Sequence, residues 1–516
     1  MWIGYFELIF SSKSCFSLNF AFLGAATRLE NLGHTNWTLI DKDDYTGGLA
    51  TSFLDKEGFT WDIGGHVIFS HYEYFNQLID AGVNHYAKHL GDPNVTEEDL
   101  KDPKNLWCYH KRESWIRYTP ETWVEYPFQN HFYTINDTQL TKECTEGILE
   151  ANYSSMFNRN KPLTNFQDWI DRVFGKGLAK HFMNPYNFKV WAYPPSEMNA
   201  VWVGERVATV DLNKTVDNII QHQHSEGHKA NPNASWGPNS SFKFPKFGGT
   251  GSIWRGVGAM LDQSKLQLNT TVAEIDTEQK LIKFENSNTI KYDSLINTMP
   301  IDILMSKIIK PTKELDVEKI FSTYGKPLHS STNVIGIGLN GKPPADLADK
   351  SWMYFHTDRS PFYRSTVLSN YSPFMVKEKG KQWSLMLEAS ESVNRPPCED
   401  IIEDTIKGLV NEKLIKESDV DDIASKWHLR MEYGYPTPYL KRNQFLDHVE
   451  PILRKNFQIY SRGRFGGWKY EVSNQDHSCL QGVEAVDNIL FGVEEQTFFY
   501  PDHVNTRKET TRTFNK

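Results

Sequence analysis

The stretch from Thr46 to His71 reads TGGLATSFLDKEGFTWDIGGHVIFSH. It carries two glycine pairs, Gly47-Gly48 and Gly64-Gly65, each beside apolar residues typical of a strand or a helix start. Glycine lets a backbone approach a flat ligand closely, because no Cβ atom stands in the way. We therefore place the candidate reactive centre in this stretch. The alternative interpretation is three ordinary turns in an α/β domain.

A short strand that ends in an acid comes before this stretch. Residues 37–41 read WTLID, a buried-strand pattern closed by Asp41. A carboxylate in that position commonly holds a ribose hydroxyl in a dinucleotide-binding fold. The acid, the first glycine pair and the Gly64-Gly65-His66 sequence together trace a path along a large cofactor such as FAD.

The phosphate-binding turn of such a fold is missing from the sequence. Residues 24–30, GAATRLE, predict a helix that leads into the strand, and a G-x-G-x-x-G turn should precede it. The sequence from Cys15 to Gly24 is CFSLNFAFLG, in which Gly24 is the only glycine. A G-x-G-x-x-G pattern does occur at Gly336–Gly341, but two prolines follow it. Because prolines argue against a helix there, we interpret this pattern as a hairpin turn.

The chain of 516 residues is too long for a single core, so we expect two or three domains. Leu106–Phe132 alternates aromatic and polar residues as strands do, whereas residues 137–217 have helical periodicity. The expected helical runs are Phe166–Phe174, Leu178–Phe188 and Val201–Val207. Later strands are expected at Thr332–Leu339, Ser351–Phe355, Phe362–Ser369 and Gln382–Ser390, and a terminal helix near Gly482–Leu490.

These patterns predict an α/β protein with a Rossmann-like FAD-binding domain in discontinuous segments, a helical insertion and an antiparallel β-sheet domain. The predicted boundaries are 1–107, 241–324 and 456–516 for the FAD-binding domain, 136–218 for the helical substrate domain, and 108–135, 219–240 and 325–455 for the antiparallel-sheet domain.

Composition restricts the partners. A formal net charge of -9 does not favour nucleic-acid binding through a basic face, and no segment is apolar enough to span a membrane. The odd, scattered cysteines suggest a reducing compartment, and we predict a cytoplasmic protein. No pair has the spacing of a zinc site. The sequence leaves the oligomeric state open, and a homo-oligomer is compatible with it.

Arginines and tyrosines supply candidate ligand contacts. Arg206, Arg364 and Arg464 stand at expected element ends, where a planar guanidinium suits phosphate oxygens. The alternative for each is a surface salt bridge. Tyrosines in similar contexts could donate to phosphate or stack on a ring, with core packing as the alternative. With no evident nucleophile, base pair or metal set, the chemistry is expected to belong to a cofactor.

Further stretches spread along the chain strengthen this interpretation. In order they are GGLA, WDIGGHVIFSH, YPFQN, NPYNFKVWA, GERVA, WGPN, GGTGSIW, PFYRSTVLSNYSP, GYPTP, GRFGGWKYEVSNQDHS and GVEAVDN. Together they resemble the eukaryotic UDP-galactopyranose mutase family, in family order from about Gly24 to Asp502. No single stretch is specific, but the set is.

The resemblance implies an enzyme that interconverts UDP-galactopyranose and UDP-galactofuranose. It also implies FAD as the cofactor, active in its reduced form, with NADPH as the reductant. In the family the reaction passes through an adduct between flavin N5 and the sugar, without net redox change. The protein would hold the diphosphate, align the anomeric carbon over N5 and exclude water.

Motif positions carry the family's site residues onto this chain. The catalytic set is His66, Arg206, Arg364 and Arg464. The substrate-binding set is Tyr126, Gln129, Phe182, Asn187, Trp191, Asn239, Tyr354, Tyr371, Tyr435 and Tyr470. The cofactor-binding set is Gly24, Asp41, Gly47, Gly48, Leu49, Gly65, His66, Val272, Asn474, Gln475, Gly482 and Asn488. Residues 221–239 and 358–371 correspond to mobile flaps over the substrate.

The N-terminus departs from the family. Met1–Leu23 does not match the strand and glycine-rich turn with which the family begins. Either the first exon is wrongly assigned, which we favour because the other motifs are intact, or part of the FAD site is lost. If the residues are real, missing backbone amides and the bulky Phe20 and Phe22 should weaken FAD binding severely.

Two other functions fit part of the pattern. A flavin-dependent amine or polyene oxidase shares the glycine pairs and the strand-end acid, but has no need of paired arginines. An inactive UDP-sugar-binding paralogue would bind UDP without using FAD.

Overall fold

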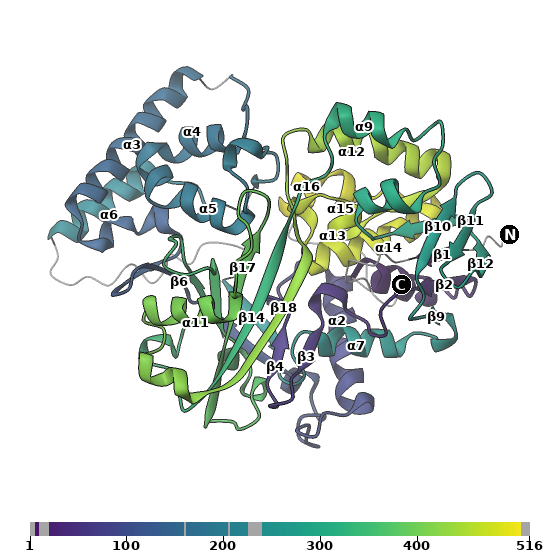
Figure 1. Ribbon diagram of the computed structural model, residues 1–516, viewed down its shortest axis with the longest axis horizontal. Helices are drawn as coiled ribbons and strands as arrows, with labels where there is room; N and C mark the ends of the chain where they lie inside the picture. Colours follow the sequence, from purple (N-terminus) through teal and green to yellow (C-terminus); the bar gives the residue numbers. More distant parts are fainter. Residues whose placement is uncertain (1–5, 10–19, 159–160, 205–206, 225–239, 507–516) are drawn as a thin grey trace.

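A parallel five-stranded sheet forms one side of the molecule (Figure 1). The structure is a computed structural model that describes residues 6–9, 20–158, 161–204, 207–224 and 240–506. The sheet has the order β19-β13-β1-β2-β9, in which every neighbouring pair is parallel. Its strands are β1 (Phe6–Ile9), β2 (Trp37–Ile40), β9 (Leu266–Gln267), β13 (Ser294–Asn297) and β19 (Ile459–Ser461). Three distant parts of the chain thus meet in one sheet, and the predicted α/β class is confirmed.

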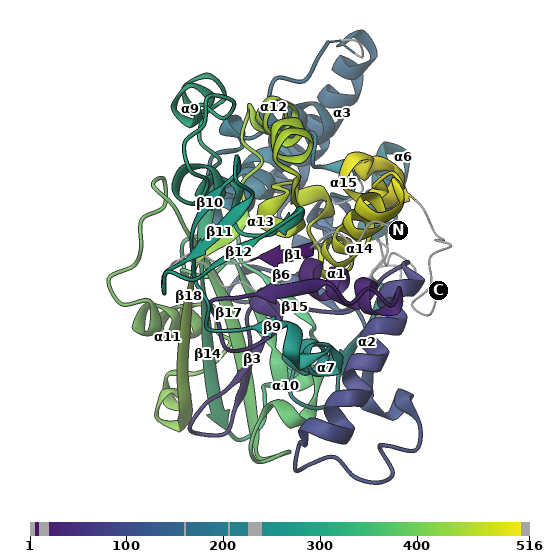
Figure 2. The same cartoon turned by 90° about the vertical axis from the view of Figure 1, so that its right-hand side faces the viewer.

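Two helices pack beside this sheet and cross at two glycines. Helix α1 (Phe20–Asn31) lies against α14 (Gln475–Phe491), as Figure 2 shows. A Cβ atom on Gly24 would lie 2.4 Å from the Cys479 carbonyl oxygen. A Cβ atom on Gly482 would lie 1.7 Å from the Ala21 carbonyl oxygen. The backbones approach this closely because both residues lack a side chain.

The N-terminal segment matches a dinucleotide fold better than its sequence suggests. Strand β1 pairs with β2 on one side and β13 on the other, so Phe6–Ile9 supplies the strand that we expected Met1–Leu23 to lack. The short run FELI is rich enough in apolar residues to form it. Of the stretch Cys15–Gly24, where the glycine-rich turn was expected, residues 15–19 lie outside the described residues and residues 20–24 belong to α1.

A larger, mostly antiparallel sheet of seven strands lies beside the first. Its order is β18-β14-β17-β16-β15-β6-β7, and within it β15 and β6 run parallel. The strands are β6 (Ser114–Thr119), β7 (Thr122–Glu125), β14 (His329–Asn340), β15 (Trp352–Tyr354), β16 (Arg364–Val367), β17 (Gln382–Glu391) and β18 (Ile423–Pro436). The expected strands between residues 332 and 390 all occur, although β16 gives way to a helical turn after Val367.

The G-x-G-x-x-G pattern at Gly336–Gly341, which we expected to be a hairpin turn, lies mostly within a strand. Gly336 and Gly338 lie inside β14, and the chain turns only after Asn340, at Gly341. A Cβ atom at Gly336 would lie 2.6 Å from the Trp61 ring, and one at Gly338 would lie 2.6 Å from the Phe59 ring. These glycines therefore allow two aromatic rings to lie flat on the strand, a packing role that local sequence does not reveal.

Four helices form a separate layer at the upper left of Figure 1. They are α3 (Thr138–Asn158), α4 (Phe166–Leu178), α5 (Asn184–Trp191) and α6 (Leu212–His224). Their core includes Phe166, Phe174 and Phe182, packed with Phe128 from the segment after β7. The third expected helical run is wrong, because residues 201–202 form a turn and Val207 a bend.

The remaining strands form three small sheets, and the remaining helices lie outside the layers described above. The small sheets pair β3 (Ser52–Leu54) with β4 (Thr60–Asp62), β5 (Trp107–Lys111) with β8 (Ser241–Pro245), and β10 (Val272–Asp276) with β11 (Leu281–Phe284) and β12 (Thr289–Lys291). The helices are α2 (Glu73–His85), α7 (Gly251–Met260), α8 (Ile301–Ile303), α9 (Val317–Tyr324), α10 (Leu368–Tyr371), α11 (Ile401–Asn411), α12 (Arg442–Pro451), α13 (Gly463–Gly466), α15 (Gln496–Phe499) and α16 (Pro501–Thr506). Among the described residues, no helix combines the length and the apolarity that crossing a membrane requires.

The α1–α14 crossing gives a stability prediction. Gly482→Ala is expected to destabilise the protein by about 1–3 kcal/mol, because the new methyl group must force two backbones apart. Gly33→Asn is the control: Gly33 has a left-handed backbone with φ of 68°, which asparagine tolerates, and open space around it. Urea unfolding followed by circular dichroism measures the stability of both variants. Equal midpoints for the two would show that the helix crossing can accommodate an added methyl group.

Candidate active site

A cavity of about 1060 Å³ lies where the Gly64–His71 segment faces the seven-stranded sheet and the residues before α14. Part of the predicted set of site residues gathers on the wall of this cavity, although these residues come from six separate parts of the chain. The predicted residues on its wall are Leu49, Gly65, His66, Tyr126, Tyr354, Arg364, Tyr435, Arg464, Tyr470, Asn474 and Gln475. Arg206 and Asn239, and residues 225–239 of the first predicted flap, lie outside the described residues.

Arg364 enters the cavity wall as half of a buried ion pair. Its Nε donates to Glu388 Oε1 at 2.7 Å, and its Nη2 donates to Glu388 Oε2 at 2.6 Å. This two-point contact fixes the plane of the guanidinium. The Glu388 carboxylate also accepts from the Tyr363 hydroxyl at 2.8 Å and from the Gly65 backbone N–H at 3.0 Å. One acid thus holds together the sheet and the glycine turn.

His66 is neutral in this setting. The pKa of His66 is lowered to about 4, mainly because the ring is buried; the charge of Glu388 opposes this shift, and the cationic Arg364 and Arg464 contribute to it. Its Nδ1 has no hydrogen-bond partner among the described residues, although no solvent reaches it. An uncharged imidazole that borders a cavity with an unused nitrogen is suited to a hydrogen bond with a bound ligand.

Aromatic rings form the sides of the cavity in two layers. The rings of Tyr126 and Tyr354, which line it, lie 4.9 Å apart. Behind them Phe182 stacks on Tyr186 at 4.9 Å, and Tyr186 contacts Tyr354. Trp191 lies 4.7 Å from the Tyr470 ring. Phe182 and Trp191, predicted as ligand contacts, therefore support the lining tyrosines from behind.

The polar groups of three other predicted substrate-binding residues form hydrogen bonds with the protein's own backbone. Gln129 donates to the Ala208 carbonyl at 2.6 Å, and Asn187 donates to the Met183 carbonyl at 2.7 Å. The Tyr371 hydroxyl donates to the Ser351 carbonyl at 3.0 Å, and the whole side chain is buried. None of the three borders the cavity.

The second predicted flap, residues 358–371, is tied to its surroundings. Lys189 Nζ donates to the carbonyl of Thr357, just before it, at 2.5 Å, and Arg359 pairs with Glu412 at 3.1 Å. Residues 364–367 form strand β16. Opening of this segment would have to break these contacts.

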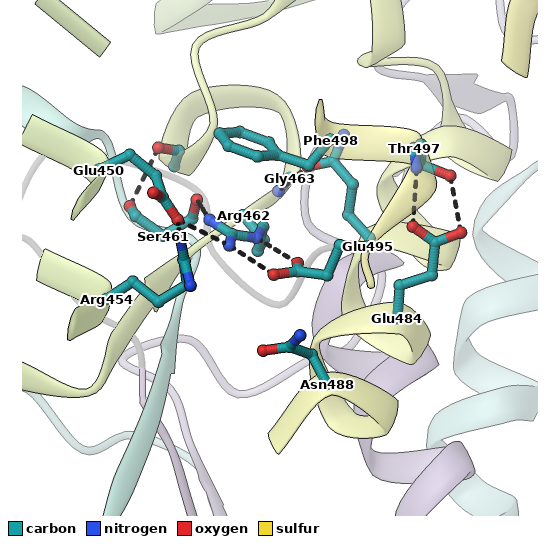
Figure 3. Close-up of polar contacts among 12 residues, drawn as sticks. Glu450, Arg454, Ser461, Arg462, Gly463, Glu484, Asn488, Glu495, Thr497 and Phe498 are labelled. Carbon is teal, nitrogen blue, oxygen red and sulfur yellow. Dashed lines mark hydrogen bonds and ion pairs between the residues drawn. The ribbon is translucent and has the colours of Figure 1, made fainter. Parts of the chain in front are cut away.

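The two arginines of the sequence Arg462-Gly463-Arg464 have different roles. Arg464 lines the cavity, and its guanidinium carbon lies 4.8 Å from the centre of the Tyr435 ring. Arg462 is fully buried on the other side, where it pairs with both oxygens of Glu495 and with Glu450 (Figure 3). This network holds the turn that presents Arg464.

The predicted cofactor contacts divide between cavity and surroundings. Asp41 is fully buried after β2, and its Oδ1 accepts from the Asp43 N–H at 2.7 Å. Gly47 and Gly48 both have positive φ and form the turn that brings Leu49 to the cavity. Four further predicted contacts do not line it: Gly24 and Gly482 form the helix crossing, Val272 is buried in β10, and Asn488 donates to the Val493 carbonyl.

The structure adds residues that the sequence did not identify. Glu388 is the most important, and a signal for it exists: it is the single acid in the apolar run WSLMLEA. An ionisable group in the middle of a buried strand needs a charged partner. Ser70 and Asp476 also line the cavity and share a hydrogen bond of 2.8 Å. Their local sequence carries no comparable signal.

Three residues on the cavity wall fit a flavin ring. His66 Nδ1, Thr332 Oγ1 and Trp352 Nε1 belong to residues on the cavity wall, are shut off from solvent, and have no hydrogen-bond partner among the described residues. A Cβ atom on Gly65 would lie 2.8 Å from Trp352 Nε1, so only glycine fits there. Phe20, at the start of α1, also lines the cavity, and the centre of its ring lies 4.7 Å from that of the Trp254 ring.

Known proteins share this arrangement. Residues 23–459 match the family described as flavin containing amine oxidoreductase. The chain belongs to this family. Like other members it is thus a flavoenzyme.

Solved structures refine the relationship within the family. The structure of a reduced UDP-galactopyranose mutase is 42% identical to this chain, covers 99% of both chains and has a TM-score of 0.86. Putrescine oxidase bound to putrescine is 11% identical, covering 94% of this chain and 99% of its own, with a TM-score of 0.58. A fatty acid isomerase from P. acnes is 12% identical, covering 95% and 99%, with a TM-score of 0.54. The last two share the fold alone, whereas the first likeness extends to the sequence.

The contrast between Arg462 and Arg464 can be measured. Arg462→Met is expected to destabilise the protein by about 3–5 kcal/mol, because it leaves the buried carboxylate of Glu495 without its cation. Arg464→Met should change stability far less, because its side chain borders the cavity. Urea denaturation midpoints of the two variants test this, and similar losses in both would contradict the division of roles.

His66 gives a pH prediction. The unfolded imidazole takes up a proton below pH 6.5, but the folded one does so only near pH 4. The unfolded state therefore binds more protons between these values, and stability falls as the pH drops through this window. His66→Gln should lose less stability than wild type between pH 7 and about pH 4.5 in urea titrations. The control is His448→Gln, at an exposed position. A wild-type slope in His66→Gln would show that the ring does not contribute.

Proposed function

We propose that this chain is a flavin-dependent UDP-galactopyranose mutase that interconverts UDP-galactopyranose and UDP-galactofuranose. The observation that carries the proposal is the cavity itself. It combines Arg364, Arg464 and the lining tyrosines Tyr126, Tyr354, Tyr435 and Tyr470 with the glycine turn of His66. The 42% identity over 99% of both chains to a reduced UDP-galactopyranose mutase supports the same activity.

FAD, in its reduced form, supplies the nucleophilic ring nitrogen N5 on which the proposed ring contraction depends. Residues of this chain would hold the flavin at the turn of Gly65, with neutral His66 in hydrogen-bond reach of its edge. Gln475 is held by Trp254, whose Nε1 donates to its Oε1 at 3.0 Å, and would contact the same cofactor. NADPH is the proposed reductant.

The cationic groups would bind the substrate diphosphate. Arg364 has its Nε and Nη2 on Glu388, so its Nη1 is the nitrogen left for a phosphate oxygen. Arg464 would add a second charge, and the hydroxyls of the lining tyrosines would donate to the remaining oxygens. Since UDP must leave the sugar and return to it, this grip also keeps UDP in the cavity during the reaction.

The part of the cavity wall formed by Tyr126 and Tyr354 would bind the uridine. Tyr126 and Tyr354 offer adjacent ring faces, and Phe182 and Tyr186 hold them from behind. Stacking of a pyrimidine on a tyrosine is favourable by about 1–3 kcal/mol. The proposed roles of Arg206 and Asn239 fall on residues outside the described part of the chain.

The activity is tested by anaerobic incubation of the protein with UDP-galactofuranose, FAD and NADPH. Chromatography of the products should show UDP-galactopyranose, and omission of the reductant should abolish it. Absence of conversion with a fully reduced flavin would reject the proposal. The oxidase alternative predicts oxygen consumption with an amine or polyene instead, and its structural support is the shared fold at 11% identity.

Arg364→Ala should lower turnover about ten- to a hundredfold while the flavin content stays unchanged. The reason is that a charge-assisted hydrogen bond to a ligand contributes on the order of 1.5–3 kcal/mol. Arg430→Ala is the matched control, since Arg430 also pairs with a buried acid, Glu391, but lies away from the cavity. Steady-state kinetics with UDP-galactofuranose compare the two, and wild-type turnover in Arg364→Ala would remove the assignment.

A further inference from the structure

All the hydrogen-bond acceptor positions of the Glu388 carboxylate are occupied by donors from the protein itself. Oε1 accepts from Arg364 Nε and the Gly65 N–H, and Oε2 accepts from Arg364 Nη2 and the Tyr363 hydroxyl. The side chain is 3% exposed. Each oxygen thus has two donors, which is the capacity of a carboxylate oxygen. Glu388 lines the cavity but has no acceptor left for a ligand or for a proton-transfer role.

On the sheet side, this carboxylate fixes Arg364. Strands β16 and β17 are antiparallel neighbours, and Arg364 and Glu388 stand directly opposite each other in their register. The two hydrogen bonds set the guanidinium plane, so its unused edge has one orientation. A bidentate contact of this kind confers geometric specificity in addition to energy. The position of the arginine's free edge is therefore decided by Glu388.

On the opposite wall, the same carboxylate fixes the glycine turn. Gly64 has φ of 98°, and the His66 N–H donates to the Gly64 carbonyl at 2.8 Å. Between them, the Gly65 N–H points to Glu388. A turn of this kind has few internal contacts, so an external acceptor is an effective anchor for it. His66 is thereby held beside the cavity.

We propose that Glu388 is a positioning residue that couples anion binding at Arg364 to the conformation of the Gly64–His66 turn. An anion drawn to Nη1 would shift the guanidinium, and the shared carboxylate would carry that shift to Gly65. The proposed function identifies the anion as a nucleoside diphosphate and the ligand at the turn as a flavin. The coupling deepens that function and rests on it for these two identities.

The sign of one effect separates positioning from simple electrostatics. Glu388→Gln removes a negative charge beside Arg364, so electrostatics alone predicts tighter binding of an anion. Positioning predicts the reverse, because an amide cannot accept both guanidinium donors. We expect Glu388→Gln to bind UDP about tenfold or more weakly by calorimetry, equivalent to the loss of a charge-assisted contact.

The coupling has its own readout in the flavin spectrum. In the flavin-loaded wild type, saturation with UDP is expected to shift the flavin absorbance through the turn. In Glu388→Gln this shift should be lost even at UDP concentrations that saturate the variant. Glu391→Gln is the control: Glu391 is on the same strand and pairs with Arg430, but does not line the cavity. Both readouts should stay at wild-type values in it.

A milder variant covers the case in which Glu388→Gln does not fold. Tyr363→Phe removes one of the four donors from Glu388 without changing any charge, and the Tyr363 side chain does not line the cavity. It should weaken UDP binding in the same direction by a few-fold and reduce the absorbance shift.

Wild-type UDP affinity in Glu388→Gln, or in Tyr363→Phe if the first variant is unfolded, overturns the proposal, as does tighter binding in either. Inorganic pyrophosphate is titrated in parallel. If the wild type binds pyrophosphate but not UDP, the proposed function fails, while a weaker pyrophosphate affinity in the variants still supports the coupling. If the wild type binds neither probe, both fail.

Discussion

A guanidinium group removed from water needs a carboxylate beside it, and this constraint organises the walls of the cavity. Taking either charge out of water costs several kcal/mol unless the partner and further hydrogen bonds replace the lost hydration. The chain meets this requirement repeatedly between elements that are far apart in sequence. The buried pairs are Arg28 with Asp487, Arg364 with Glu388, Arg442 with Glu471 and Arg462 with Glu495. Of these four, the Arg364 pair borders the cavity, where the same pair would also serve the proposed ligand binding.

The sequence predicted those parts of the structure that depend on local pattern. Alternation located the strands of the large sheet, and glycine pairs located the turn at the cavity. Local pattern failed where the reason for a residue lies in a distant segment. Gly336 accommodates Trp61, and Gly24 accommodates the backbone at Cys479. Neither neighbour can be inferred from spacing along the chain.

The candidate site shows the same limit. Residue type suggested Arg206, Arg364 and Arg464 as candidates, because a planar guanidinium suits phosphate oxygens. Residue type does not separate Arg464 from Arg462, two residues away; the family resemblance selected Arg464, and the tertiary structure places Glu495 against Arg462 and the cavity against Arg464. The family resemblance assigned ligand contacts to Gln129 and Asn187, whose amide nitrogens donate to backbone carbonyls inside the protein. Resemblance identifies the neighbourhood of a site, but not which side chains form its inner surface.

The order of strands in the five-stranded sheet has a bearing on how the chain acquires its structure. Strand β1 is near the start of the chain, β13 joins it from residue 294, and β19 is added only from residue 459. Pairing of such distant segments is slow, because a long loop must close before any contact compensates for it. During synthesis β1 can pair early with the nearby β2, but its other edge stays open until β13 has been made, and the edge of β13 stays open until β19 has been made. The face of α1 that packs on α14 is exposed for longer still, which makes the nascent chain dependent on protection from aggregation.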